Sequence, residues 1–238
     1  MLTAYDYPTA KILSQEAIDM LLVGDSLGMV VLGYKDTKSV TLNDMVRHTA
    51  AVVRGNKESL VIADMPLHTT DTAGMAIANC RFVLEQTGAQ AVKIEGHAQI
   101  AEALVQVGIA VMGHTGLKPQ IAEKYGLRGK EKLEADLIYD EAVDLEKAGA
   151  FAVVLECVPT VLAEKITKKL KVPTIGIGAG NVCDGQVLVV SDMIGLFEDF
   201  KPKFVRRYGQ AAKLIKDAVS QFKKDVESGN FPAEEESY

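Results

Sequence analysis

The sequence predicts a closed (β/α)₈ barrel, and three observations lead to this fold class. Short apolar runs of strand length recur eight times, most of them are continuous rather than alternating, and segments with helical periodicity lie between them. Continuous apolar runs are typical of parallel strands that helices cover. Eight such units in 238 residues favour a closed barrel, because an open doubly wound sheet is expected at fewer strands.

The expected strands cover residues 2–6, 20–25, 60–66, 91–96, 109–116, 150–158, 172–180 and 186–193. The expected helices cover about 8–17, 42–55, 72–88 and 139–150, with Thr41 as the N-cap of the second and Gly88 ending the third. Long connections follow the second and fifth strands, and such insertions tend to be functional in a barrel. We expect a single domain over 1–238, with a C-terminal helix and tail at about 204–238.

Composition narrows the class of protein. A net charge of −6 gives no basic face for a polyanion, so we expect no nucleic-acid partner. No long apolar run predicts a membrane span, and the first residues lack the pattern of a signal peptide. Three cysteines without CxxC spacing suit a reducing compartment, so we expect a cytoplasmic protein.

Two opposite charges interrupt the fourth apolar run, AVKIEG. If Val92 and Ile94 face the outer helices, the alternation of a strand sends Lys93 and Glu95 together into the barrel mouth. Neighbouring runs also close on ionisable residues, namely Asp6, Asp25, Asp64, His114 and Glu156. The C-terminal ends of barrel strands converge, so these side chains are expected to approach one another.

Three carboxylates in one partly desolvated space strongly disfavour joint ionisation. Lys93 can offset one charge of the set Asp25, Asp64 and Glu95, and a hard divalent cation such as Mg²⁺ can offset two and accept oxygen ligands. Such an ion, chelated by a 2-oxo acid, would act as a Lewis acid for an enolate. Simpler roles are also open: Asp6 as a helix N-cap, Lys93 and Glu95 as a structural ion pair, and His114 as a turn residue.

The chain closely resembles the ketopantoate hydroxymethyltransferase family. The resemblance rests on LTAYDYPTA, LLVGDSLGMVVLGY, IADMP, VKIEG, GHTGLKPQ, VLECVP and IGIGAGNVCDGQ, which occur in this order over essentially the whole chain. It implies a (β/α)₈ barrel of the phosphoenolpyruvate/pyruvate-type superfamily, a homodecamer, and a need for Mg²⁺. It also implies transfer of a one-carbon unit from 5,10-methylenetetrahydrofolate to 3-methyl-2-oxobutanoate, giving 2-dehydropantoate for pantothenate synthesis.

The resemblance also implies roles for individual residues. Asp25, Asp64 and Glu95 match the Mg²⁺ ligands, with Glu95 acting directly or through water. Ser26 and Lys93, with Asp25 and Asp64 beside them, match the groups that bind the substrate carboxylate and carbonyl. Glu156 matches the general base, and His114 is a candidate contact for substrate or folate.

The chain departs from the family at its start and its end. The family usually carries a helix before the first strand, so we expect either a native start upstream of Met1 or an open barrel floor. Leu67 and His68 stand where an aromatic residue is common, and the EEESY ending differs from the family's. Two other functions stay open: a Mg²⁺-dependent 2-oxo acid lyase on the same barrel, and a non-catalytic barrel that binds a metabolite.

Overall fold

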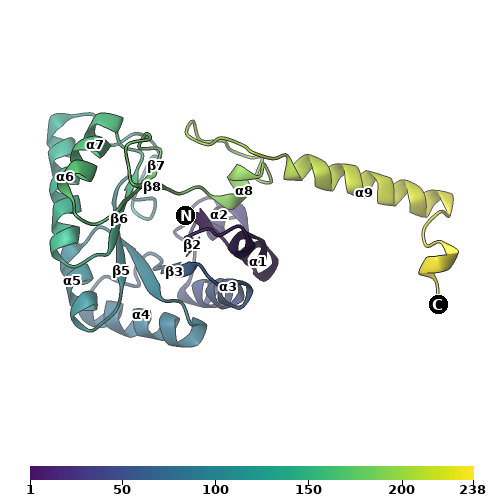
Figure 1. Cartoon of the computed structure of the whole chain (residues 1–238), viewed down its shortest axis with the longest axis horizontal. Helices are drawn as coiled ribbons and strands as arrows, with labels where there is room; N and C mark the ends of the chain where they lie inside the picture. Colours follow the sequence, from purple (N-terminus) through teal and green to yellow (C-terminus); the bar gives the residue numbers. More distant parts are fainter. The chain divides into compact units, whose positions relative to one another are not determined.

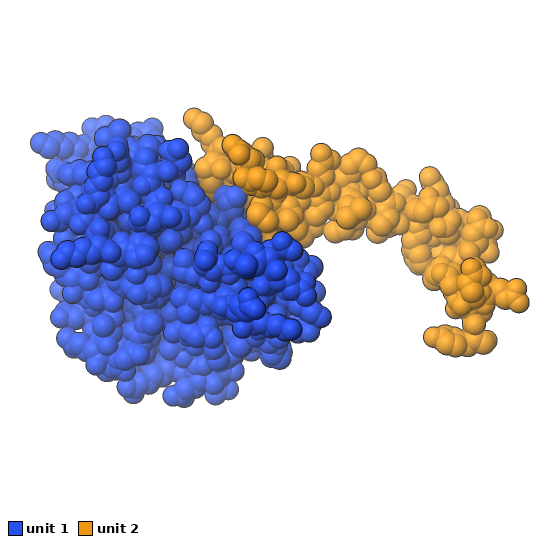
Figure 2. Space-filling view, viewed as in Figure 1, with its two compact units in different colours: residues 1–189 blue, residues 190–238 orange.

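A computed structural model describes residues 1–238 and divides them into two compact units, Met1–Val189 and Val190–Tyr238 (Figure 2). The first unit contains one eight-stranded parallel sheet whose strands follow one another in chain order. Its strands are β1 Leu2–Thr3, β2 Met20–Val23, β3 Leu60–Asp64, β4 Ala91–Glu95, β5 Val111–Gly116, β6 Ala152–Glu156, β7 Thr174–Ile177 and β8 Gly185–Gln186.

The two edges of this sheet meet. Leu2 forms a parallel bridge with Leu188, and the Thr3 N–H donates a hydrogen bond of 3.1 Å to the Leu188 carbonyl oxygen. The expected α/β barrel architecture is therefore confirmed. The strands are shorter than the apolar runs suggested, and residues 190–193, expected to end the eighth strand, form the short helix α8, Val190–Met193. The run QVLVVSDM is too short to show a helical period, so the sequence pattern did not separate helix from strand at its end.

Helices form the outer layer of the first unit (Figure 1). They are α1 Tyr7–Gln15, α2 Leu27–Val30, α3 Leu42–Gly55, α4 Ala73–Thr87, α5 Ala98–Gln106, α6 Lys132–Lys147 and α7 Thr160–Lys169. The cap predictions are confirmed: Thr41 caps α3, and Gly88 ends α4 in the left-handed region at φ 77°. Helix α6 begins seven residues before the expected start, and α5 and α7 lie where no helix was predicted.

The inside of the barrel is filled by one buried layer of apolar side chains. The layer comprises Leu22, Ile62, Ala91, Met112, Ala152, Val154, Ile175 and Val187. Each strand from β2 to β7 contributes to it, so the cylinder has a packed interior rather than a pore. Any site must therefore lie beyond this layer, toward the ends of the strands.

The second unit contains α8, the long helix α9, Ala211–Ser228, and the short 3₁₀ helix η1, Glu234–Glu236. The expected C-terminal helix is thus present, and it ends at Gly229 in the left-handed region. Several large apolar side chains on α9 are exposed, among them Leu214, Val219 and Phe222. No helix of the chain is both long enough and apolar enough to cross a membrane.

Candidate active site

The inward-facing rows of four neighbouring strands change from apolar to ionisable at their C-terminal ends. Two residues beyond the apolar layer, Ile62 is followed by Asp64, Ala91 by Lys93, Met112 by His114, and Val154 by Glu156. Glu95 stands two residues further along β4 than Lys93, on the same face. The expected inward direction of Lys93 and Glu95 therefore agrees with the period of β4, and both side chains are buried.

Asp64 and Lys93 form a buried ion pair. They are register partners on β3 and β4, and Lys93 Nζ lies 2.7 Å from Asp64 Oδ1 and 2.8 Å from Oδ2. Burial alone lowers the pKa of Lys93, but the charges of Asp64, Glu95 and Asp25 outweigh it and raise that pKa above its usual value. The lysine is therefore a fixed positive charge. The Asp25 N–H donates to Asp64 Oδ2 at 3.4 Å, which brings the end of β2 to the same pair.

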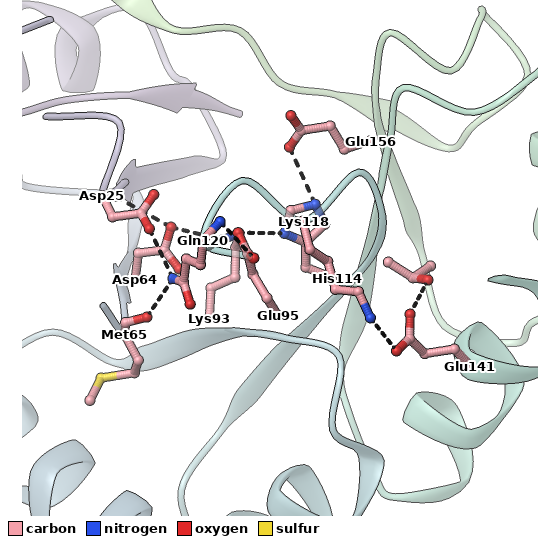
Figure 3. Close-up of polar contacts among 11 residues, drawn as sticks. Asp25, Asp64, Met65, Lys93, Glu95, His114, Lys118, Gln120, Glu141 and Glu156 are labelled. Carbon is pink, nitrogen blue, oxygen red and sulfur yellow. Dashed lines mark hydrogen bonds and ion pairs between the residues drawn. The ribbon is translucent and has the colours of Figure 1, made fainter. Parts of the chain in front are cut away.

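Glu95, His114 and Glu156 form a second row across β4, β5 and β6 (Figure 3). His114 Nδ1 lies 3.6 Å from Glu95 Oε1, and Nε2 lies 3.2 Å from Glu156 Oε2, but neither ring nitrogen makes a hydrogen bond of ordinary geometry. Burial, and then the charge of Lys93, lowers the pKa of His114 to about 3, so the ring is neutral. The row is thus a neutral imidazole between two carboxyl groups.

Burial is the largest cause of high pKa values for three carboxyl groups in the mouth. It raises the pKa of Asp25 to about 7, with the charge of Asp64 as the next cause. It raises the pKa of Glu156 to about 8 and that of Glu95 to about 9. The Glu156 side chain is 17% exposed, against 5% for Glu95 and 3% for Asp64. Of Glu156, Glu95 and Asp64, Glu156 therefore has the most accessible side chain.

The charges of the site suit a divalent cation. Four carboxyl groups face one lysine, so the mouth holds more acidic groups than positive charges to match them. No group of three or more His, Cys, Asp or Glu side chains is arranged to hold a metal ion by itself. Magnesium needs no such cage, because it usually takes one or two carboxylates and completes its shell with water and substrate oxygens. The oxygen donors present therefore fit Mg²⁺.

Gln120 contacts the site and was not singled out from the sequence. It lies in the connection between β5 and α6, and its Nε2 donates to Asp25 Oδ2 and to the Met65 carbonyl oxygen, both at 2.8 Å. Its backbone N–H donates to Glu95 Oε2 at 3.3 Å. The sequence offered two signals, the length of this connection and the place of Gln120 at the end of the GHTGLKPQ motif, but neither assigned this residue a role.

The structure places the remaining candidates at the edge of the site or outside it. Ser26 follows Asp25, and its Oγ lies 2.8 Å from the hydroxyl of Tyr5, a buried residue that the sequence did not indicate. Asp6 is exposed and caps α1 by accepting a hydrogen bond from the Thr9 N–H at 2.8 Å. Its simpler interpretation is therefore correct, and Asp6 is not a site residue.

Solved structures of other enzymes have the same fold. A 2,3-dimethylmalate lyase, described as a member of the PEP mutase/isocitrate lyase superfamily, matches with a TM-score of 0.63 at 17% identity, over 94% of this chain and 82% of its own. A phosphonopyruvate hydrolase in complex with oxalate and Mg²⁺ matches with a TM-score of 0.63 at 14% identity, over 99% and 87%. At these identities the likeness shows the fold.

Sequence comparison is more specific. The family model described as ketopantoate hydroxymethyltransferase matches residues 1–234. Proteins named 3-methyl-2-oxobutanoate hydroxymethyltransferase match over the whole chain: 49% identical in Syntrophus aciditrophicus, 48% in Clostridium novyi and 50% in Chloroflexus aurantiacus, covering 90%, 89% and 86% of those proteins. The chain therefore belongs to the ketopantoate hydroxymethyltransferase family of enzymes.

Proposed function

We propose that this enzyme transfers a hydroxymethyl group from 5,10-methylenetetrahydrofolate to 3-methyl-2-oxobutanoate and so forms 2-dehydropantoate for pantothenate biosynthesis. Relatives 48–50% identical over the whole chain carry the name of this activity. The observation that carries the mechanism is Glu156, a partly accessible carboxyl group with a raised pKa in the barrel mouth. A base whose pKa lies near the working pH is suited to proton transfer.

In this proposal Asp25 and Asp64 hold Mg²⁺, with Glu95 completing the site directly or through water. When bound, the ion supplies Lewis-acid stabilisation of negative charge on the substrate carbonyl oxygen. Lys93 has three N–H donors, and its hydrogen bonds within the chain go to the two carboxylate oxygens of Asp64. It can therefore also donate a hydrogen bond to a substrate oxygen. Ser26 stands beside Asp25 and is proposed to bind the substrate carboxylate.

Glu156 removes the proton from C3 of the oxo acid, and the electrons of that C–H bond form the enolate. Lys93 is a buried, positively charged donor in the mouth, and it is proposed to stabilise this negative charge, because a charge in a buried mouth acts more strongly than in water. C3 then bonds to the folate methylene carbon as the first of its two C–N bonds breaks, and water supplies the hydroxyl group as the second C–N bond breaks. One folate nitrogen takes up the proton that Glu156 removed from C3, and the other takes up a proton from the water. His114, neutral and beside Glu156, is proposed to orient substrate or folate.

Hydrogen exchange at C3 tests the chemistry apart from folate. The wild-type enzyme with Mg²⁺ in D₂O is expected to exchange the C3 proton of 3-methyl-2-oxobutanoate, as followed by proton NMR. Glu156→Gln is expected to slow this exchange by about 10²- to 10⁴-fold, the usual contribution of a positioned base. Glu102→Gln, which removes an exposed carboxylate on α5, is the matched control and is expected to exchange at the wild-type rate. Exchange at the wild-type rate in Glu156→Gln would contradict the assignment.

Proton NMR of the products, recorded with and without 5,10-methylenetetrahydrofolate, separates the other two functions. A lyase on this barrel would break down a 2-oxo acid without any folate. A non-catalytic barrel would bind the oxo acid and exchange no proton in either variant. Formation of 2-dehydropantoate only when 5,10-methylenetetrahydrofolate is present is the result expected here.

The homo-oligomer, a homodecamer by resemblance, is also part of this proposal. It is supported by the apolar side chains on α9, where Leu214 is 71% exposed and Val219 and Phe222 are more than half exposed. Replacing Leu214 and Phe222 with glutamate is expected to lower the molar mass of the oligomer, as measured by light scattering. A monomeric wild-type protein would contradict the proposed homo-oligomer.

A cytoplasmic location is also part of the proposal. It accords with three cysteines that form no disulfide.

A further inference from the structure

Gln120 is a buried residue in a largely exposed connection. In residues 117–131, between β5 and α6, Gln120 is 8% exposed, whereas its neighbour Ile121 is 62% exposed and Tyr125 is 48% exposed. A glutamine is rarely buried unless its amide is satisfied. The contacts of this amide therefore explain why the connection turns inward at this point.

Those contacts all lie in the barrel mouth (Figure 3). Both amide hydrogens have acceptors, because Nε2 lies 2.8 Å from Asp25 Oδ2 and 2.8 Å from the Met65 carbonyl oxygen. The backbone N–H of Gln120 lies 3.3 Å from Glu95 Oε2. A single residue thus donates to the carboxyl groups of two different strand ends, one after β2 and one on β4.

We propose that Gln120 is a positioning residue for the metal site, an inference that rests on the proposed Mg²⁺ ligands. Its amide hydrogen bond fixes the rotation of the Asp25 carboxylate and uses a lone pair of Oδ2, while Oδ1 is left to the cation. Its backbone N–H does the same for one oxygen of Glu95. Groups that orient a ligating carboxylate in this way tune metal affinity, and their loss typically weakens binding by about 10- to 100-fold.

The same hydrogen bonds hold the connection against the mouth. The start of the connection is tied from its other side, because Lys118 Nζ lies 2.7 Å from Glu141 Oε1 on α6 and the Thr115 hydroxyl donates to Glu141 Oε2. Beyond Gln120 the residues up to Leu127 are mostly exposed. Loss of the Gln120 amide is therefore expected to loosen the segment that contains Lys124.

The test is Mg²⁺ binding by calorimetry, with MgCl₂ as the only ligand. Gln120→Leu keeps the size of the side chain and removes both donors, and we expect it to weaken Mg²⁺ binding by about 10- to 100-fold. Gln106→Leu removes an amide on α5 that donates to Glu102 at 3.4 Å on the exposed surface, and it is expected to bind Mg²⁺ like the wild type. A purely structural role would lower the unfolding temperature and leave the affinity of the folded protein unchanged. Unchanged or tighter binding in Gln120→Leu would overturn the inference.

A second measurement separates this inference from the proposed function. Trypsin cleavage after Lys124, measured without metal, is expected to be faster in Gln120→Leu than in Gln106→Leu. If the wild type binds no Mg²⁺, the proposed metal site fails, and with it the positioning role, whatever the cleavage rates. If the wild type binds Mg²⁺ and Gln120→Leu binds it equally well, only the role of Gln120 fails.

Discussion

The Asp64–Lys93 pair and the Glu95–His114–Glu156 row lie in the same barrel mouth but differ in how their polar atoms are satisfied. In the pair, both carboxylate oxygens lie within 2.8 Å of one ammonium nitrogen. In the row, the shortest contact is 3.2 Å, and neither nitrogen of His114 makes an ordinary hydrogen bond. The pair therefore maintains its charges, whereas the row resists ionisation.

This difference suggests different roles for the pair and the row. Side chains whose charges are matched within the chain are stable as they stand and give the site a fixed shape. Side chains that are buried without matching charge, with pKa values of about 8 and 9 for Glu156 and Glu95, gain most from a cation or substrate. The Asp64–Lys93 pair thus carries matched charges, and the carboxyl groups of the row are the ones left for a ligand to match.

The largest expected effect on stability comes from breaking the pair. Lys93→Met leaves the Asp64 carboxylate buried beside Asp25 without its cation, and removing one partner of a buried pair costs about 3–5 kcal/mol. Urea unfolding of the metal-free protein measures this loss. Adding Asp64→Asn to the same chain is expected to restore a large part of the stability, because it removes the unpaired charge.

Lys118→Met is the matched control for this experiment. Lys118 contacts Glu141 at the same 2.7 Å, but both side chains are 25% exposed, so water screens the charge that remains. We expect a loss of about 1 kcal/mol or less. Equal losses in Lys93→Met and Lys118→Met would show that burial does not distinguish the two pairs.

Glu95→Gln probes the row and is expected to stabilise the metal-free protein. The pKa of Glu95 is about 9 in the folded protein and about 4.5 in the unfolded chain. The stabilisation by the protonated Glu95 is therefore fully present below pH 4.5, and the wild-type protein loses it as pH rises toward 9. Glutamine does not titrate, so the gain is absent near pH 4.5 and grows with pH. The size of the pKa shift leads us to expect that Glu95→Gln is about 1–3 kcal/mol more stable than the wild type at pH 7. Urea unfolding at several pH values measures this gain.

Glu102→Gln on α5 is the control for that series. Glu102 is exposed, and its variant is expected to change stability by no more than about 0.5 kcal/mol at any pH tested. A Glu95→Gln protein that is less stable than the wild type throughout would mean that the Glu95 carboxylate is well satisfied without a metal.

The pair and the row were predictable from the sequence for a local reason. A strand alternates with period two, so a charge inside an apolar run such as AVKIEG has a definite direction once its neighbours are known to face helices. Parallel strands of a barrel then bring their ends together without further information. Five strand-end residues were predicted to converge on this basis, and the structure brings four of them, Asp25, Asp64, His114 and Glu156, into one mouth. Asp6 is the exception, because it caps α1 at the surface.

Gln120 could not be predicted in the same way, because an irregular connection has no period that fixes the direction of a side chain. Its position depends on tertiary contacts with Asp25 and Met65, which lie 95 and 55 residues away in the chain. The hydroxyl contact between Tyr5 and Ser26 has the same origin. Helix α8 was missed for another reason, since an apolar run of a few residues fits either helix or strand.

The smallest effect expected of the three stability variants concerns a carboxylate outside the mouth, Asp44 at the start of α3. It forms a capping box, accepting the Thr41 N–H at 3.0 Å while the Asp44 N–H donates to the Thr41 hydroxyl at 3.2 Å. The Thr41 hydroxyl is the largest cause that lowers the pKa of Asp44. Asp44→Ala is expected to cost about 1 kcal/mol at pH 7 in urea unfolding, and Asn43→Ala, on the same turn, much less.

The pH dependence of this loss has the opposite sign to that of Glu95. A lowered pKa means that the stabilisation by Asp44 is present above the unfolded value, about 3.9, and disappears as pH falls through the lower folded value. The difference between wild type and Asp44→Ala should therefore start to shrink as pH falls below about 3.9 and disappear once pH is below the lower folded value, whereas Glu95→Gln and wild type have already converged below about pH 4.5. A difference for Asp44→Ala that does not shrink as pH is lowered from about 5 to about 2 would show that the carboxylate acts through packing rather than through charge. In that case the contrast between a satisfied and an unsatisfied carboxyl group would hold only for the two groups inside the barrel.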